Sequence, residues 1–177
     1  MTKFKVVCIS FGVLVAAILL LAATRPGRFR VERTTSIKAP PEKIFPLINE
    51  FRRWSSWSPY EKLDPAMKRA YSGATDGKGA VYEWDSQGNA GAGRMEITEV
   101  SQPSKVTINL DFLRPFTAHN IAEFTLDSQG DSTNVTWAMH FPNPYIAKLM
   151  SLFISMDRMV GKDFEVGLAN LKAITEK

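Results

Sequence analysis

The sequence is poor in the residues that bind metals. Its 177 residues include one cysteine, Cys8, and two histidines, His119 and His140. A single cysteine cannot form a disulfide within the chain. Neither histidine has a cysteine or a second histidine at ligand spacing, which excludes the common zinc motifs. The sequence therefore predicts no metal site and no cofactor.

Catalytic motifs are also missing. No GxSxG elbow is present, although a Ser-His-Asp set assembled from distant residues stays open. The glycine-rich run GNAGAG at 88–93 precedes a strand pattern, whereas a phosphate loop needs a helix start there. It is typical of a hairpin turn, and no catalytic residue is predicted.

The folded part of the chain lacks a basic excess. The net charge is +4, and Lys3 and Lys5 belong to the N-terminal segment. Of the remaining 20 basic residues, four cluster at Arg25, Arg28, Arg30 and Arg33. The rest of the chain then has 16 basic residues against 18 acidic ones. A nucleic-acid-binding face needs basic residues spread over the domain, so nucleic acid is not an expected partner.

One long apolar run is present, at residues 6–24, and it carries no charge. As a helix it would extend about 28 Å, close to the thickness of a bilayer core. A cleaved signal peptide is the alternative, but the run is long for one and the cleavage pattern is poor. We expect residues 1–25 to form a membrane anchor helix and residues 26–177 to form the ligand-binding domain.

The side of the membrane stays open. Four arginines after the run favour a cytoplasmic domain by the positive-inside rule. A short basic N-terminus before an apolar run also resembles an export signal.

Alternating apolar and polar residues predict seven strands. They cover residues 29–37, 67–73, 80–87, 93–101, 105–113, 118–127 and 134–141. The last six are separated by short turn-like segments, which favours an antiparallel meander. Because the apolar residues share one face, the sheet should be buried on one side only.

Two helical regions flank the meander. Residues 39–51 should form short helices that break or kink at Pro46. An apolar stripe predicts one continuous helix over residues 144–174, in which Gly161 and Gly167 suggest a bend or a close backbone approach. Asp157 and Asp163 are expected on its solvated edge.

The stretch FRRWSSWSPY, residues 51–60, has three alternatives: a ligand mouth, a nucleic-acid platform or a buried plug. Without a wider basic surface the nucleic-acid alternative has no support. We expect Trp54 and Trp57 to fill an open end of the sheet with an indole N–H bonded to the backbone, and Arg52 and Arg53 to face water.

The order of elements predicts an α+β fold in which a curved antiparallel sheet of about seven strands wraps on a long C-terminal helix, preceded by one transmembrane helix. A bent sheet rarely packs flush on a helix, so an apolar pocket is expected between them.

The run IKAPPEKIFPLINEFRRWSSWSPY at 37–60 resembles the start of the START-like, or SRPBCC, helix-grip superfamily, most of all its polyketide cyclase/dehydrase-like branch. Similar support comes from FLRPF at 112–116, TNVTW at 133–137 and the closing run at 156–172. The resemblance covers residues 29–175. It looks like the membrane-anchored bacterial members, which implies a single-pass protein of the bacterial inner membrane. Because activities vary across the superfamily, no catalytic residue can be carried over.

The resemblance and the apolar faces together suggest binding of a lipid or another apolar small molecule, without catalysis. The alternatives are a cyclase or hydrolase acting on such a ligand, and a protein-interaction module without a cavity. Asn120 should point inward, either as a polar handle or as a strand-end residue bonded to backbone. The predicted cavity lining is Trp84, Met95, Ile97, Phe112, Asn120, Ala122, Phe124, Trp137, Met139, Met150, Phe153 and Met156.

Overall fold

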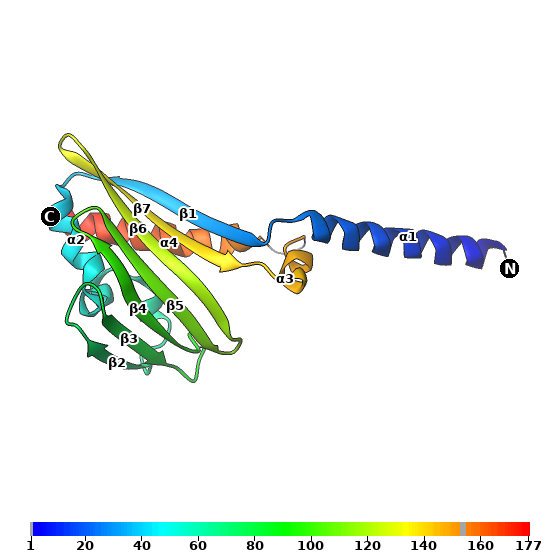
Figure 1. The fold of residues 1–177 in the computed structure, drawn as a ribbon, viewed down its shortest axis with the longest axis horizontal. Helices are drawn as coiled ribbons and strands as arrows, with labels where there is room; N and C mark the ends of the chain where they lie inside the picture. The colour runs from blue at the N-terminus through cyan, green and yellow to red at the C-terminus, as the bar shows by residue number, and fades with distance from the viewer. Residues whose placement is uncertain (1, 153–154) are drawn as a thin grey trace.

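A seven-stranded antiparallel sheet forms the body of the protein (Figure 1). The computed structural model describes residues 2–152 and 155–177. The strands lie in the order β1-β7-β6-β5-β4-β3-β2, which confirms the predicted meander and places β1 beside the last strand. Their bounds are β1 Arg28–Ile37, β2 Lys68–Gly73, β3 Ala80–Asp85, β4 Ala92–Ser101, β5 Lys105–Arg114, β6 Ala118–Gln129 and β7 Ser132–Pro142.

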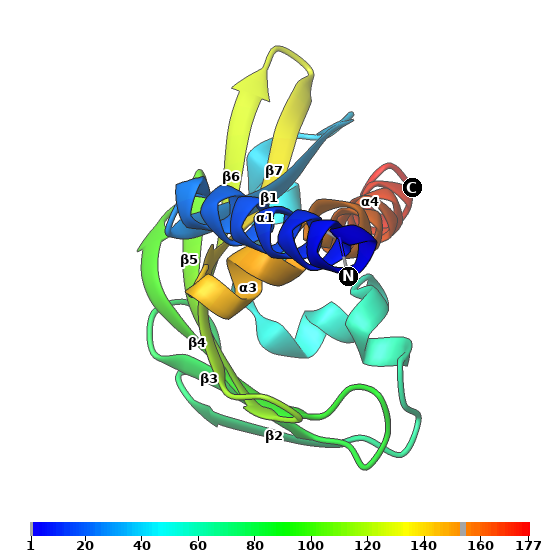
Figure 2. The same cartoon turned by 90° about the vertical axis from the view of Figure 1, so that its right-hand side faces the viewer.

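The strand register agrees with the alternation in the sequence. Phe124 on β6 pairs with Trp137 on β7, and Ala122 pairs with Met139. All four side chains are buried on the concave face. A shift of the register by one residue would turn them to solvent, so the predicted inward face of these strands is confirmed. Figure 2 shows the sheet curving around the side on which α4 and the short helices lie.

Three short helices follow β1: α2 (Pro41–Asn49), η1 (Phe51–Ser56) and η2 (Pro59–Lys62). Of the two alternatives predicted at Pro46, a break or a kink, the break is wrong, because α2 continues through this proline and ends at Asn49. Pro46 removes one backbone hydrogen bond, and burial of Ile44, Phe45 and Ile48 holds the helix on the core. The break falls at Glu50, whose backbone is extended.

The C-terminal helix is not continuous, contrary to the prediction. It consists of α3 (Tyr145–Met150) and α4 (Met156–Thr175). Ser155 has an extended backbone, and its hydroxyl accepts a hydrogen bond from the Arg158 N–H at 3.2 Å. This N-cap starts a new helix even though the apolar stripe continues in the sequence.

The two glycines of α4 allow its backbone to approach neighbouring side chains closely. This is one of the two alternatives predicted for them, the other being a bend. A Cβ atom on Gly167 would lie 2.7 Å from the Trp137 ring, and one on Gly161 would lie 2.0 Å from the Arg33 guanidinium. The Arg33 side chain thereby reaches across α4 to Asp157 and Glu165, with nitrogen–oxygen distances of 3.0 and 2.6 Å. Glycine at these positions lets α4 lie directly on β1 and β7.

The N-terminal segment forms a helix, α1 (Thr2–Thr24), that extends away from the sheet (Figure 1). Val7, Ile9 and Phe11 are among its exposed apolar side chains, and the Tyr145 hydroxyl of α3 donates to the Leu19 carbonyl at 2.9 Å. Over the residues that are described, no helix has the length and apolarity needed to cross a membrane. The helix is therefore confirmed, whereas the predicted transmembrane span is not supported.

Candidate functional site

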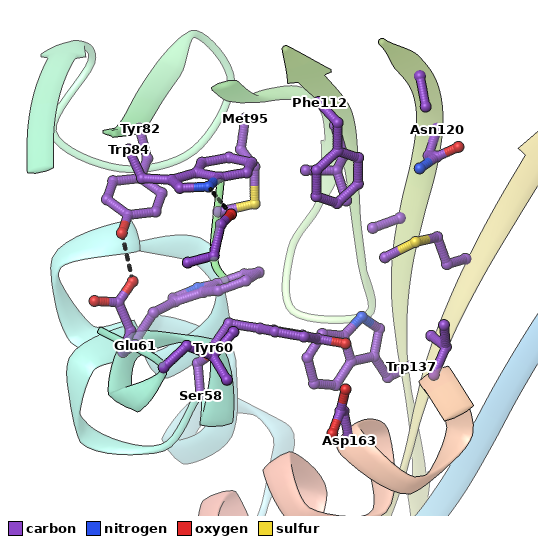
Figure 3. A pocket seen from close by; sticks show the side chains of 18 of the residues that line it. Ser58, Tyr60, Glu61, Tyr82, Trp84, Met95, Phe112, Asn120, Trp137 and Asp163 are labelled. Carbon is purple, nitrogen blue, oxygen red and sulfur yellow. Dashed lines mark hydrogen bonds between the residues drawn. The ribbon is translucent and has the colours of Figure 1, made fainter. Parts of the chain in front are cut away.

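A cavity of about 460 Å³ lies between the concave face of the sheet, the η1–η2 segment and the first turns of α4. Figure 3 shows its walls: Trp84, Met95 and Phe112 on the sheet face Tyr60 and Glu61 of η2, with Asp163 of α4 at one side. Most of the wall is apolar or aromatic. The sheet curves away from α4 at β3–β5, and this curvature leaves the space that the aromatic side chains only partly fill.

Most residues predicted for the lining are found there. Those that line the cavity are Trp84, Met95, Phe112, Asn120, Ala122, Trp137, Met139 and Met156. Ligand contact by these side chains stays a prediction, but the structure brings them to one space.

The other predicted lining residues lie elsewhere. Ile97 and Phe124 are fully buried in the core beneath the cavity wall. Met150 is the last residue of the separate helix α3 and is 54% exposed. Phe153 falls outside the described residues.

Three residues of the wall carry buried polar atoms without a hydrogen-bond partner in the described structure: Ser58 Oγ, Asn120 Oδ1 and Trp137 Nε1. The three residues are at most 5% exposed. Buried polar groups are nearly always paired in folded proteins, and an unpaired one costs free energy. Their position in the wall of the cavity therefore points to polar atoms of a ligand.

Asp163 lines the cavity beside the hydroxyl of Tyr60, so its predicted place on the solvated edge of the helix is wrong. Burial is the main cause that raises the pKa of Tyr60, and the charge of Asp163 and a hydrogen bond to it add to the effect. The Tyr60 hydroxyl thus stays protonated at neutral pH and lies near the Asp163 carboxylate (Figure 3).

A second carboxylate, Glu61, is fully engaged. It accepts a hydrogen bond from the Tyr82 hydroxyl at 2.6 Å and pairs with Arg69 Nε at 2.6 Å. Burial, followed by this bond to Glu61, raises the pKa of Tyr82. Arg69 is not in the cavity wall, so it neutralises Glu61 from behind.

The tryptophans of FRRWSSWSPY are buried between η1 and the sheet. Trp54 Nε1 donates to the Ile48 carbonyl and Trp57 Nε1 to the Leu47 carbonyl, each at 2.9 Å. This confirms the predicted backbone bonds and the plugging role, while Trp54 also forms part of the cavity wall. Arg52 lies over the Tyr71 ring at 4.4 Å, and Arg53 pairs with Glu50.

The histidines lie away from the cavity. His119 Nδ1 is 2.7 Å from Asp111 Oδ1, and His140 Nε2 is 3.0 Å from Glu123 Oε2. Within residues 2–152 and 155–177, no three histidine, cysteine or acidic side chains gather as metal ligands. Neither histidine contributes to the cavity wall.

Several lining residues were not predicted. Tyr82 and Leu110 could have been found, because they share a strand face with Trp84 and Phe112 at period two. No periodic pattern in the sequence identifies the residues of η2 as lining residues. Asp163 is a polar residue beside the apolar stripe of α4, so the pattern does not identify it either. The further lining residues are Ser58, Tyr60, Glu61, Leu63, Met67, Asn89, Ala90, Ala118, Phe141, Pro142 and Val160.

Solved structures share this fold at low sequence identity. Protein CV1439 from Chromobacterium violaceum has a TM-score of 0.58 at 14% identity, over 86% of this chain and 99% of that one. Major latex-like protein 151 from Panax ginseng has a TM-score of 0.61 at 12% identity, over 86% and 100%. The Aha1 dimer from Colwellia psychrerythraea has a TM-score of 0.56 at 17% identity, over 84% and 96%. At this identity the likeness shows the helix-grip fold alone.

Curated proteins and family profiles give different results for this sequence. No curated protein matches the chain significantly. The sequence profile of one family, described as polyketide cyclase / dehydrase and lipid transport, matches residues 28–176, which is nearly the whole chain after α1. The chain belongs to the polyketide cyclase / dehydrase and lipid transport family.

Proposed function

We propose that the protein binds a lipid or another apolar small molecule in the cavity between the sheet and α4, without converting it chemically. The observation that carries this proposal is an apolar cavity of about 460 Å³ whose wall contains buried polar atoms without partners. Cavities of about 300–1,000 Å³ with mostly apolar walls and few polar groups are typical of small-molecule sites. The description of the family includes lipid transport, which supports the same reading.

Binding can be tested with Nile red, an uncharged fluorescent apolar dye, and the purified full chain. We expect saturable fluorescence enhancement with micromolar affinity. Ala122 lies on the cavity wall, so an Ala122→Trp variant should fill the space and weaken binding at least about tenfold. Met139→Trp tests the wall on the next strand in the same way.

The matched control is Ile121→Trp. Ile121 is the neighbour of Ala122 on β6, and its side chain points to the outer face, where it is 43% exposed. This variant adds the same ring without entering the cavity and should keep wild-type affinity. The carrier proposal fails if wild type binds no apolar dye, or if Ala122→Trp and Met139→Trp both fold and bind as wild type does.

Acid–base catalysis on the bound ligand is the second candidate. It is favoured by the pair of Tyr60 and Asp163 at the cavity, a protonated donor next to a carboxylate. A carboxylate there could remove a proton next to a ligand carbonyl. Bound dodecan-2-one in D2O would then exchange its α-hydrogens faster with wild type than with Asp163→Asn. Equal exchange rates would remove this candidate.

The protein-interaction alternative assumed a core without a cavity. Because the sheet and α4 enclose one, no observation on the described residues favours this alternative.

A membrane location through residues 1–25 stays a prediction. It depends on the uncharged run at 6–24, and the described helices do not support a crossing. Fractionation of cells that express the full chain, followed by a carbonate wash, tests it. Recovery in the washed membrane pellet is the expected result, and release into the supernatant would contradict it. The side of the domain is tested by protease protection in the same preparation.

A further inference from the structure

The charges around the cavity are all of one sign. Asp163 and Glu61 are the charged residues of its wall, and no lysine, arginine or histidine lines it. Glu61 is neutralised by Arg69, with its side chain only 6% exposed. Asp163 forms no ion pair with a cation in the described part of the chain, and the Tyr60 hydroxyl is the polar group that Figure 3 shows beside it. A negative ligand group would therefore lie near an uncompensated carboxylate in a site of low dielectric.

The wall of the cavity also carries two groups with N–H donors, the Trp137 indole and the Asn120 amide. The indole nitrogen of Trp137 has no partner, and Figure 3 shows it on the cavity side of the ring. Figure 3 shows the amide nitrogen of Asn120 toward the cavity, and its buried oxygen, which is an acceptor, also lacks a partner in the described structure. N–H groups require an oxygen acceptor from the ligand.

These two observations select a chemical class. An oxygen acceptor satisfies the donors, but the acceptor of a fatty acid is a carboxylate that brings a negative charge and finds no cation in the wall. A protonated amine would suit Asp163 but cannot accept from Trp137 or Asn120. A ketone, ester or alcohol satisfies the donors without introducing charge.

We propose that the cavity selects an uncharged apolar molecule bearing carbonyl or hydroxyl oxygens, and discriminates against fatty-acid carboxylates. The N–H groups of Trp137 and Asn120 bind its oxygens, and Asp163 repels anions. This inference rests on the proposed carrier function and names the ligand class of the same site.

Three probes of equal chain length test the selection: dodecan-1-ol, dodecanoate and dodecylammonium. Each is titrated at pH 7, below its aggregation limit, into the full chain, and its affinity is measured by displacement of Nile red. We expect the alcohol to bind at least about tenfold more tightly than dodecanoate, and more tightly than the ammonium.

Two variants assign the effect to residues. Asp163→Asn keeps a partner for Tyr60 and removes the charge, so it should reduce the preference for alcohol over dodecanoate at least about threefold. Asp76→Asn removes the same charge from an exposed turn and should leave the preference unchanged. Asn120→Leu should weaken binding of the alcohol or shift the preference, whereas Asn109→Leu on the outer face of β5 should do neither.

The experiment distinguishes failure of the ligand selection from failure of the carrier function. Binding of dodecanoate as tight as that of the alcohol overturns the selection and leaves the carrier function standing. Tightest binding of the ammonium shows that attraction to Asp163 dominates and also overturns it. If wild type binds none of the probes and no Nile red, the carrier function itself fails. An equal effect of Asp163→Asn and Asp76→Asn contradicts the assigned role of Asp163.

Discussion

Trp137 of β7 and Phe164 of α4 stack face to face, with ring centroids 4.2 Å apart and ring planes 10° apart. Phe124 stacks on Trp137 with centroids 5.0 Å apart. The three rings form a column from β6 through β7 to α4, and all are at most 2% exposed. This column holds the helix on the sheet at one edge of the cavity, where Trp137 also presents its N–H.

Removing one ring from this column should destabilise the domain strongly. Phe164→Ala leaves a cavity under Trp137, and we expect a loss of about 3–5 kcal/mol in the free energy of unfolding. Urea denaturation of the full chain measures it. Val166→Ala, on the exposed side of the same helix, should cost no more than about 0.5 kcal/mol. Equal losses in the two variants would show that the column does not hold α4.

Trp57 should stabilise the domain through the hydrogen bond of its indole N–H as well as through the packing of its ring. Trp57→Phe removes the N–H that pairs with the Leu47 carbonyl at the end of α2. We expect a loss of about 2–3 kcal/mol, from the unpaired carbonyl and the smaller ring together. Trp84→Phe makes the same exchange at a half-buried residue and should cost less. Thermal and urea unfolding of both variants decide between these expectations.

The Arg33–Asp157 pair predicts a specific sensitivity to acid. Hydrogen bonding from Arg33 holds the pKa of Asp157 below its ordinary value. The stabilisation is therefore present above the unfolded pKa of about 3.9 and is lost as the pH falls through the lower folded pKa. Wild type should lose more stability than Asp157→Asn between about pH 5 and pH 3.

The effect should be small, because the Asp157 side chain is 53% exposed and solvent screens the pair. Urea midpoints at several pH values measure it, and Asp76→Asn serves as the control for loss of one negative charge. A pH dependence in Asp157→Asn as steep as that of wild type would contradict the pairing.

We expect residues 26–177 to fold without α1. The sheet, α2 and α4 share one hydrophobic core, and α1 extends away from it. The truncated chain should unfold cooperatively in urea and bind Nile red as the full chain does. Persistent aggregation, or a broad transition without cooperativity, would show that α1 belongs to the folding unit.

The sheet was predictable because its signal is local and repeated. In β5, Val106, Ile108 and Leu110 alternate with residues of the other face, and the turns between strands are rich in glycine and proline. The break before α4 was not, since the apolar stripe runs through residues 151–155 and the decisive feature is the backbone of Ser155. The break at Glu50 rather than Pro46 likewise depends on packing of α2 against the core.

The site was predictable on its sheet side only. Strand alternation identifies Met95, Phe112 and Met139 as inward residues, because one strand face is enough to place them. Tyr60 and Glu61 reach the cavity from a short helix, and Asp163 reaches it from the first turns of α4. These depend on tertiary geometry that no periodic pattern records. Whether Asn120 was a polar handle or a strand-end residue also required the structure, which leaves its amide oxygen unpaired.

The pairing of β1 with β7 sets the timing of folding during synthesis. Arg28 pairs with Pro142 and Ile37 with Thr133, so the first strand to leave the ribosome waits for the last one. Strands β2 to β6 can zip together as neighbours in the meantime, while β1 and its buried Val31 stay without a partner. An unpaired strand edge is a site of aggregation, and contacts so far apart in sequence form slowly. A nascent chain stalled before β7 would therefore be the species that most needs a chaperone, and the β1 amides that pair with β7 would become protected only once synthesis has passed residue 142.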